Sequence, residues 1–211
     1  MKSQGMTRLL KGSCSILLAL ALIGCATKMS PEERLALKRV SIGSIELPEK
    51  PFVPPAGTGA AFFLAGPLGV ALANGSTDLP TAFKDHLAKN NIDVAAYIRS
   101  ELISQLKSKG IEVVNSENRG NPVLVVQVLQ YGLTGGLMSD DRLPQLWLRL
   151  SLRKESGELM WLGFAAAHST QGITEIVPPR PIPDFFNDPK LLERDFRKVT
   201  NVIVSSAMKD L

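Results

Sequence analysis

Apolar residues recur at helical spacing in two long stretches of the chain. The first stretch begins after Asp93, a good N-cap residue, and ends before Gly110, which suits a left-handed helix end. Its apolar positions are Val94, Ile98, Leu102 and Leu106, widened by Ala95 and Ile103. The second begins at Asp188-Pro189, and its stripe is Leu192, Phe196, Val199, Ile203 and Ala207. We therefore predict amphipathic helices over 94–109 and 189–209, each with one face to bury.

Other stretches follow the pattern of a β-strand. The predicted strands span 40–47, 111–114, 122–131, 146–153 and 159–168. Residues 122–131 are apolar at successive positions, which indicates a central strand covered on both faces for part of its length. Residues 146–153 alternate leucine with other side chains, and Glu155-Ser156-Gly157 then predicts a hairpin turn.

The remaining segments carry weaker patterns. Ser30-Pro31 followed by Glu33 predicts a brief capped helix. Residues 78–91 are polar and variable, with Phe83 and Leu87 as the candidate anchors. The polar stretch 115–121 predicts a turn, the stretch 132–142 a flexible loop, and the proline-rich stretch 172–189 an ordered or semi-rigid loop instead of a strand.

These elements predict an α+β fold. Strands joined by a hairpin are antiparallel, and two helices that each have one apolar face must bury it against a sheet. We expect a two-layer sandwich, with an antiparallel or mixed sheet of about four to five strands and both helices on one face. Residues 40–211 would form a single domain, preceded by a tether and short helix over 25–39.

The first 24 residues have the pattern of a secretory signal. Lys2, Arg8 and Lys11 make a cationic start, and the apolar run to Ile23 is too short to cross a bilayer as a settled helix. Leu22, Ile23, Gly24 and Cys25 then resemble the lipobox of bacterial lipoproteins. An ordinary signal peptide, or an N-terminal membrane helix that stays, is the alternative.

The lipobox resemblance implies an anchor and an address. In that family the peptidase cuts before the cysteine, so Cys25 would receive a diacylglycerol and an N-acyl chain. Two or more acyl chains hold a protein stably on a bilayer. Ala26 follows Cys25 where an aspartate would resemble the inner-membrane retention signal. The expected location is therefore the outer membrane, in preference to the inner membrane, with the domain facing the periplasm.

Residues 51–77 contain no charged residue. Their apolar centre is shorter than a bilayer is thick, and Pro67 interrupts helix formation. Small residues recur every four positions, the spacing that lets helices approach closely: Ala61, Ala65, Gly69 and Ala73. Two interpretations stay open. The segment 57–75 enters the membrane or packs with other copies in a homo-oligomer, or it is a loop with a short helix.

Composition excludes several classes of function. Without the signal segment the net charge of +4 falls close to neutral, and no basic stripe remains for a nucleic acid. Cys14 would be removed and Cys25 acylated, which leaves no disulfide. His86 and His168 stand alone, Asp140-Asp141 lie in a glycine-rich loop, and no phosphate-loop or nucleophile-elbow motif occurs. We expect no catalytic residues, metal or other cofactor, and we expect Trp147 and Trp161 to face each other across the hairpin.

The core of the chain resembles small periplasmic lipoproteins. The resemblance rests on residues 107–114, 125–132 and 156–161 and covers roughly 93–169. ABC-transport auxiliary lipoproteins and the lipopolysaccharide-assembly lipoprotein are the most similar in plan, with a related core in curli-secretion-type and penicillin-binding-protein activator lipoproteins. This resemblance implies a non-catalytic accessory or scaffold subunit of an envelope transport or assembly complex. The alternative is an oligomer whose segment 57–75 helps to form an export or lipid-handling pore.

Overall fold

A computed structural model describes residues 29–54, 78–115, 120–135, 141–170 and 172–211. Five strands cross its sheet in the order β2-β1-β3-β4-β5. Their bounds are Glu112–Val114 (β2), Arg39–Glu46 (β1), Val123–Thr134 (β3), Asp141–Arg153 (β4) and Leu159–Ala166 (β5). β1 runs parallel to β2 and β3, whereas β3, β4 and β5 are antiparallel, and the two-residue strand β6 (Arg180–Pro181) pairs with β4 outside this order. The sheet is therefore mixed, and the predicted fold class is confirmed.

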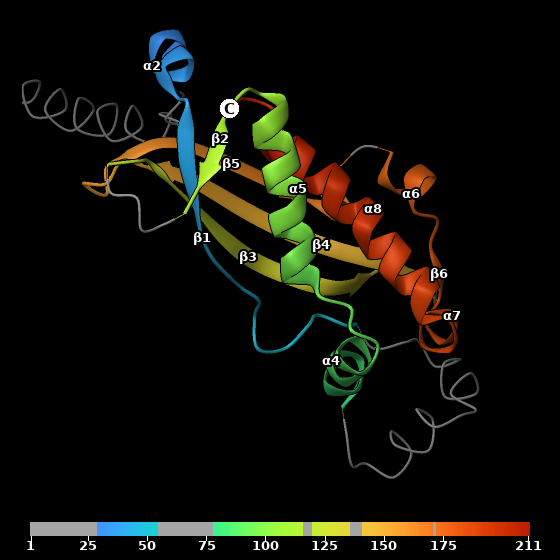
Figure 1. The fold of residues 1–211 in the computed structure, drawn as a ribbon. Coiled ribbons are helices and arrows are strands. Elements are labelled where there is room, and N and C mark those ends of the chain that lie inside the picture. The colour runs from blue at the N-terminus through green and yellow to red at the C-terminus, as the bar shows by residue number, and fades with distance from the viewer. Residues whose placement is uncertain (1–28, 55–77, 116–119, 136–140, 171) are drawn as a thin grey trace, which may run out of the picture.

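Two long helices cover one face of this sheet (Figure 1). α5 (Val94–Ser108) lies against β1 and β2, and α8 (Pro189–Ala207) lies against β4 and β5. The helices also contact each other, and Gln105 Nε2 donates a hydrogen bond of 2.9 Å to Ser205 Oγ. α5 begins at its predicted cap, Asp93, and α8 begins at the predicted Asp188-Pro189, while Gly110 has a φ of +74° at the end of α5.

The centre of the core lies between α8 and β4. On β4 four alternate leucines are fully buried: Leu146, Leu148, Leu150 and Leu152. Arg149 and Arg153 point to the opposite face and are exposed. The period-two pattern of this strand therefore identified its buried face correctly.

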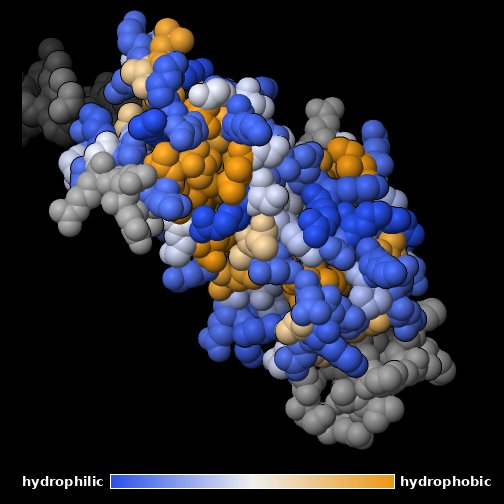
Figure 2. Space-filling model, in the orientation of Figure 1, coloured by the Kyte–Doolittle hydropathy of each residue, from blue (hydrophilic) through white to orange (hydrophobic). Residues whose placement is uncertain are grey.

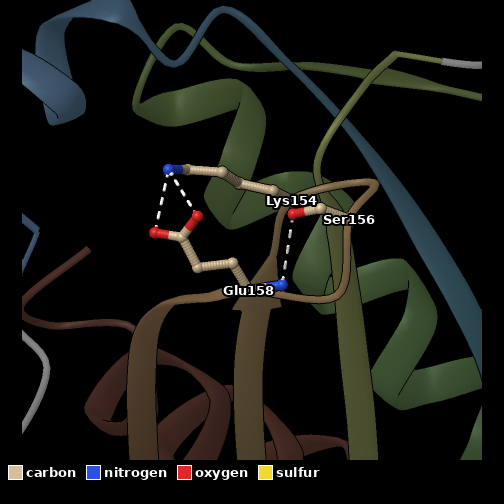
Figure 3. A network of polar contacts seen from close by, with 3 residues as sticks. All are labelled: Lys154, Ser156 and Glu158. Atoms are coloured by element: carbon tan, nitrogen blue, oxygen red, sulfur yellow. Dashed lines mark hydrogen bonds and ion pairs between the residues drawn. The ribbon is translucent and has the colours of Figure 1, made fainter.

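The hairpin between β4 and β5 closes at the predicted residues. Gly157 has a φ of +86°, and its N–H donates a hydrogen bond to the carbonyl of Lys154. Figure 3 shows Lys154 and Glu158 facing each other, with Nζ at 2.9 Å from both carboxylate oxygens, while the Glu158 N–H lies 3.4 Å from Ser156 Oγ. This ion pair is exposed, so it contributes little to stability.

The expectation that the two tryptophans face each other is wrong. Trp147 stands opposite Ala166 in the register, and Trp161 stands opposite Leu152. Trp161 is buried beneath α8, whereas the ring of Trp147 lies on the other face, 4.8 Å from the ring of His168. Trp161 therefore shares the face of Leu152, which is an odd number of residues from Trp147 along β4. Residues separated by an odd number lie on opposite faces of a strand, which explains the error.

Two segments are more regular than the sequence pattern indicated. Residues 79–89 form a helix, α4 (Leu79–Lys89), to which the sequence pattern had assigned no element. Phe83 and Leu87 are buried in it, so the two anchors are confirmed. The proline-rich stretch contains α6 (Ile173–Ile176), β6 and α7 (Ile182–Asn187). Proline is tolerated in the first turn of a helix and in an edge pairing, so these prolines do not prevent short elements.

β3 continues three residues beyond its predicted end. Phe52, further along the chain from β1, donates an N–H to the carbonyl of Tyr131 and accepts from the N–H of Leu133. Gly132 lies opposite Phe52 with a φ of +136°, and a Cβ atom there would collide with the Phe52 backbone. Because this partner comes from a distant part of the chain, the loop expected from residue 132 onward is ordered strand as far as Thr134.

Two short elements flank the sheet. The capped helix α2 (Pro31–Ala36) precedes β1, and both halves of its predicted capping box are formed between Ser30 and Glu33. The 3-10 helix η2 (Ala167–Ser169) follows β5. Met29, just before α2, is only 3% exposed and belongs to the core cluster. The described chain is therefore packed into the domain from its first residue.

Candidate functional site

The residues that the sequence singled out lie outside the described part of the chain. They are Leu22, Ile23, Gly24 and Cys25 of the lipobox, and Ala61, Ala65, Gly69 and Ala73 of the uncharged segment. Their roles stay predictions. A candidate site must therefore be found on the described domain itself, and the sheet edge at β2 offers one.

β2 is too short to cover its neighbour. It pairs with β1 only from Arg39 to Ser41, whereas β1 continues to Glu46 against β3 on its other side. Along residues 42–46, β1 therefore has no strand beside it on the β2 side among the residues that the structure describes. The register of β1 against β3 also shifts between Ile42 and Ile45, which bends the strand at this point.

The hollow left beside β1 is walled by one side of α5. It has a volume of about 680 Å³ and is open to solvent. It is lined by Ile42, Gly43, Ser44, Arg99, Ile103, Val113, Val114 and Asn115. Figure 2 shows a patch of hydrophobic surface over β2 and the adjoining side of α5, bordered by hydrophilic side chains. We call this feature the β1 hollow.

Arg99 supplies the charge of the β1 hollow. Its Nη2 donates a hydrogen bond of 2.7 Å to the carbonyl oxygen of Gly43, and the side chain is half-buried. Its guanidinium forms no ion pair with a carboxylate of the described residues. The described residues of the lining include no acid, histidine or cysteine, so the chemistry that they offer is that of a cationic, partly apolar binding surface.

Sequence reasoning missed this site. It placed Arg99 away from the apolar seam of the helix, which is correct, but it counted Ile103 as part of the buried face. Ile103 is 40% exposed, because β2 ends before it can cover that side of α5. The available signal was the difference in length between the short strand predicted at 111–114 and the longer one predicted at 40–47. That signal could not be used, because the local sequence pattern does not show which strands pair.

A second hollow, of about 630 Å³, lies between the end of β1 and α4. It is lined by Leu47, Pro48, Glu49, Lys84, Leu87, Ala88, Asn91, Ile92, Asp93, Val94 and Tyr131. Burial raises the pKa of the Tyr131 phenol. Charges of both signs line this hollow, namely Glu49, Lys84 and Asp93. It therefore has no uniform charge that would select a ligand.

The two histidines do not form a site together. His86 Nε2 lies 3.1 Å from the carbonyl oxygen of Phe185, and its ring packs 4.6 Å from that of Phe186, so it holds α4 against α7. Burial lowers the pKa of His86. His168 instead packs on Trp147. Within the described ranges, no cluster of three or more histidine, cysteine or acidic residues is placed to hold a metal ion.

One buried carboxylate has a structural environment. Asp195 on α8 is 1% exposed, with Arg194 Nε at 3.2 Å and Arg180 Nε at 3.7 Å from its oxygens. Arg180 belongs to β6, so this ion pair joins α8 to the strand that pairs with β4. It leads into neither hollow, and we assign it to the packing of α8.

Comparisons with known proteins give distant structural similarities. No family model and no curated protein matches the chain. A minor lipoprotein of Acinetobacter baumannii is 12% identical, with a TM-score of 0.38 over 82% of this chain and 95% of that one. The lipoprotein GNA1162 of Neisseria meningitidis is 19% identical, with a TM-score of 0.23 over 61% and 81%. The hypothetical protein CT253 of Chlamydia trachomatis is 8% identical, with a TM-score of 0.25 over 82% and 98%. Two of these neighbours are bacterial lipoproteins, but similarities this distant do not define a family for the chain.

Proposed function

We propose that this chain is a lipid-anchored bacterial lipoprotein, and that it acts as a non-catalytic accessory or scaffold subunit of an envelope transport or assembly system. The tetrad Leu22-Ile23-Gly24-Cys25, placed directly after a short apolar run with a cationic start, is the observation that carries the proposal. Cleavage before Cys25 and acylation of that residue would hold the domain on a bilayer.

The short tether supports this proposal. Four residues lead from Cys25 to Met29, and a chain of that length spans at most about 14 Å. Met29 is already part of the core, so the anchor would keep the domain close to the membrane surface. Ala26 after the cysteine favours the outer membrane, with the domain facing the periplasm.

The β1 hollow supports a role in binding. It combines exposed apolar side chains with one arginine, which suits the docking of a partner molecule. We therefore assign to it the contact with an envelope protein complex. No nucleic acid and no cofactor besides the acyl groups on Cys25 belong to this proposal.

Replacement of the anchoring cysteine tests the proposed function. We expect Cys25→Ser to remain uncleaved or to be released into the soluble fraction, because neither acyl chain can be attached. Cys14→Ser changes a cysteine inside the apolar run and serves as the matched control, with normal membrane fractionation expected. Fractionation with the outer membrane, combined with mass spectrometry of the amino terminus, measures both. A processed, membrane-bound Cys25→Ser protein would contradict the proposal.

The alternative function is an oligomer whose segment 57–75 enters the membrane. The small-residue spacing at Ala61, Ala65, Gly69 and Ala73 favours it. Among the helices that the structure describes, none is both long and apolar enough to cross a bilayer. Deletion of 57–75 separates the two functions. The alternative predicts a smaller oligomer and a lower detergent requirement, and an unchanged protein on both measures would exclude it.

A further inference from the structure

We propose that the β1 hollow binds an extended peptide segment of a partner protein as an added β-strand, with an acidic side chain of that peptide paired to Arg99. This inference rests on the proposed function, since it names the chemistry of the partner that the anchored domain would dock.

The backbone of β1 provides the first part of the argument. β3 occupies one side of β1 from Ser41 to Glu46, but β2 occupies the other side only from Arg39 to Ser41. A strand edge without a partner presents N–H and C=O groups that another extended chain can pair with. A peptide lying in line with β2 would meet β1 along residues 42–46.

Arg99 provides the second part. Its guanidinium donates a hydrogen bond to the carbonyl oxygen of Gly43, a residue that lines the hollow. In a paired sheet such a carbonyl accepts a hydrogen bond from the N–H of the neighbouring strand. An arginine has five N–H donors, and the bond to Gly43 uses one of them. The remaining donors and the positive charge favour a carboxylate, which guanidinium groups bind in a bidentate geometry. None of the described residues that line the hollow is acidic, so a carboxylate of the bound molecule would find no competing acid among them.

The spacing on α5 provides the third part. Arg99 and Ile103 are four residues apart on one side of the helix, which corresponds to about 6 Å along its axis. Side chains two residues apart on a strand share a face and are about 6.6 Å apart. Since α5 lies alongside β1, one peptide can place an acidic side chain at Arg99 and an apolar side chain at Ile103. The expected motif is therefore an acidic and an apolar residue two positions apart.

Short synthetic peptides test this proposal on the full chain in detergent micelles. The probes are fluorescein-labelled heptapeptides of alternating threonine and valine, with one aspartate placed two positions before or after a central valine. We expect saturable binding by fluorescence anisotropy for at least one order. Replacing the aspartate by asparagine should weaken binding about tenfold or more. Methylation of alternate backbone nitrogens should abolish binding, because it removes the N–H groups of the added strand.

Protein variants locate the binding site. We expect Arg99→Gln and Ile103→Asp each to raise the Kd about tenfold or more. The matched controls are Arg149→Gln, an exposed arginine on the opposite face of β4, and Leu129→Asp, a leucine of β3 that is 47% exposed. Neither control should change the Kd. Thermal melting of every variant checks the fold, and the peptide substitutions test the same contacts without altering the protein.

Several results would overturn the proposal. One is the absence of saturable binding for either peptide order, and another is binding that is indifferent to Arg99→Gln and Ile103→Asp. Binding that appears only after deletion of 57–75 would make that segment the natural occupant. A concentration-dependent dimer in ultracentrifugation that Ile103→Asp abolishes would make a second copy the occupant. The peptide-binding measurement does not require the acyl anchor. Failure of the Cys25→Ser prediction would therefore contradict the proposed lipid anchor without changing the measured peptide affinity.

Discussion

Single side chains decide where the helices of this domain begin. In four helices a backbone N–H of the first turn donates a hydrogen bond to the capping side chain, and these caps are Ser30, Asp78, Asp93 and Asp188. Such a cap satisfies a backbone donor that the helix itself leaves without a partner. Ser30 and Asp93 were recognised as caps from sequence. Asp78 was not, although Pro80 follows it in the first turn of α4 as the rule for helix starts expects.

Asp78 makes the start of α4 dependent on pH. Its hydrogen bonds with Thr81 and then with Lys50 lower the pKa of this carboxyl from 3.8 to about 2. A depressed pKa in the folded state stabilises the protein above the unfolded value, and this contribution disappears as the pH falls from 3.8 through about 2. We expect the Thr81 amide to exchange faster with solvent over that range, measured by hydrogen exchange with NMR.

Asp78→Asn is the control for this pH dependence. Asparagine caps a helix well but does not titrate, so exchange at Thr81 in this variant should not respond to pH through the carboxyl group. An equal acid response in the wild type and in Asp78→Asn would contradict the assigned origin.

At the scale of elements, a glycine allows α8 to approach the edge strand β5. A Cβ atom on Gly163 would collide with the carbonyl oxygen of Ala207, at the end of α8, and with the ring of Trp161. Backbone and a buried indole cannot move aside as a flexible side chain can. Gly163 therefore sets the distance between the helix layer and the sheet at this point.

We expect Gly163→Ala to lower the free energy of unfolding by about 1–3 kcal/mol, the usual cost of overpacking a core. Gly43→Ala is the matched control, since it also changes a strand glycine but its new Cβ would lie 3.6 Å from the nearest atom, the carbonyl oxygen of Leu124. Denaturant unfolding compares the two variants. Equal stability of both variants would show that α8 can shift at no cost.

The assignment of the buried face of β4 has its own test. Leu150 is fully buried beneath the helices, so Leu150→Asp places a charge without a partner in the core. We expect a loss of about 4 kcal/mol or complete unfolding, observed as the loss of the melting transition. Leu129→Asp makes the same chemical change at an exposed leucine and should retain the transition. A native transition in Leu150→Asp would contradict the assigned face.

At the scale of the whole molecule, one hydrophobic cluster joins the two ends of the described chain. The cluster includes Met29 before α2 and Leu211 after α8, and it continues through both long helices and the sheet. Polar contacts add to it, since Asn201 on α8 donates to Glu101 on α5 at 3.0 Å. A core shared in this way predicts that the domain unfolds as one unit.

We expect a single thermal transition. Circular dichroism follows the helices, while fluorescence follows Trp147 and Trp161 in the sheet, so coincident curves would show that both layers melt together. Gly163→Ala should shift both curves equally. Separate midpoints for the two probes would indicate two independent units and would contradict the single domain.

The local sequence pattern of this chain predicted the elements that bury one regular apolar face. α5, α8 and strand β4 each have a period that holds over many residues, and the apolar positions predicted for them are buried except Ile103, which is 40% exposed, and Ala95, which is partly buried. The errors arose where a partner distant in sequence decides the structure. Phe52 extends β3 through Gly132, and Arg180 pairs with β4, and neither pairing leaves a mark in the local sequence.

The sequence by itself determined the two amphipathic helices, the hairpin turn and the alternation that orients β4, and it alone carries the resemblance to a lipobox. Each of these depends on residues that are neighbours along the chain, because caps, turns and periodic faces are local properties of the backbone. Only the tertiary structure decided the strand order, the parallel pairing of β1 and the hollow beside it. That hollow exists because β2 stops after three residues while β1 and α5 continue, and the relative lengths of paired elements are settled only when distant segments pack together.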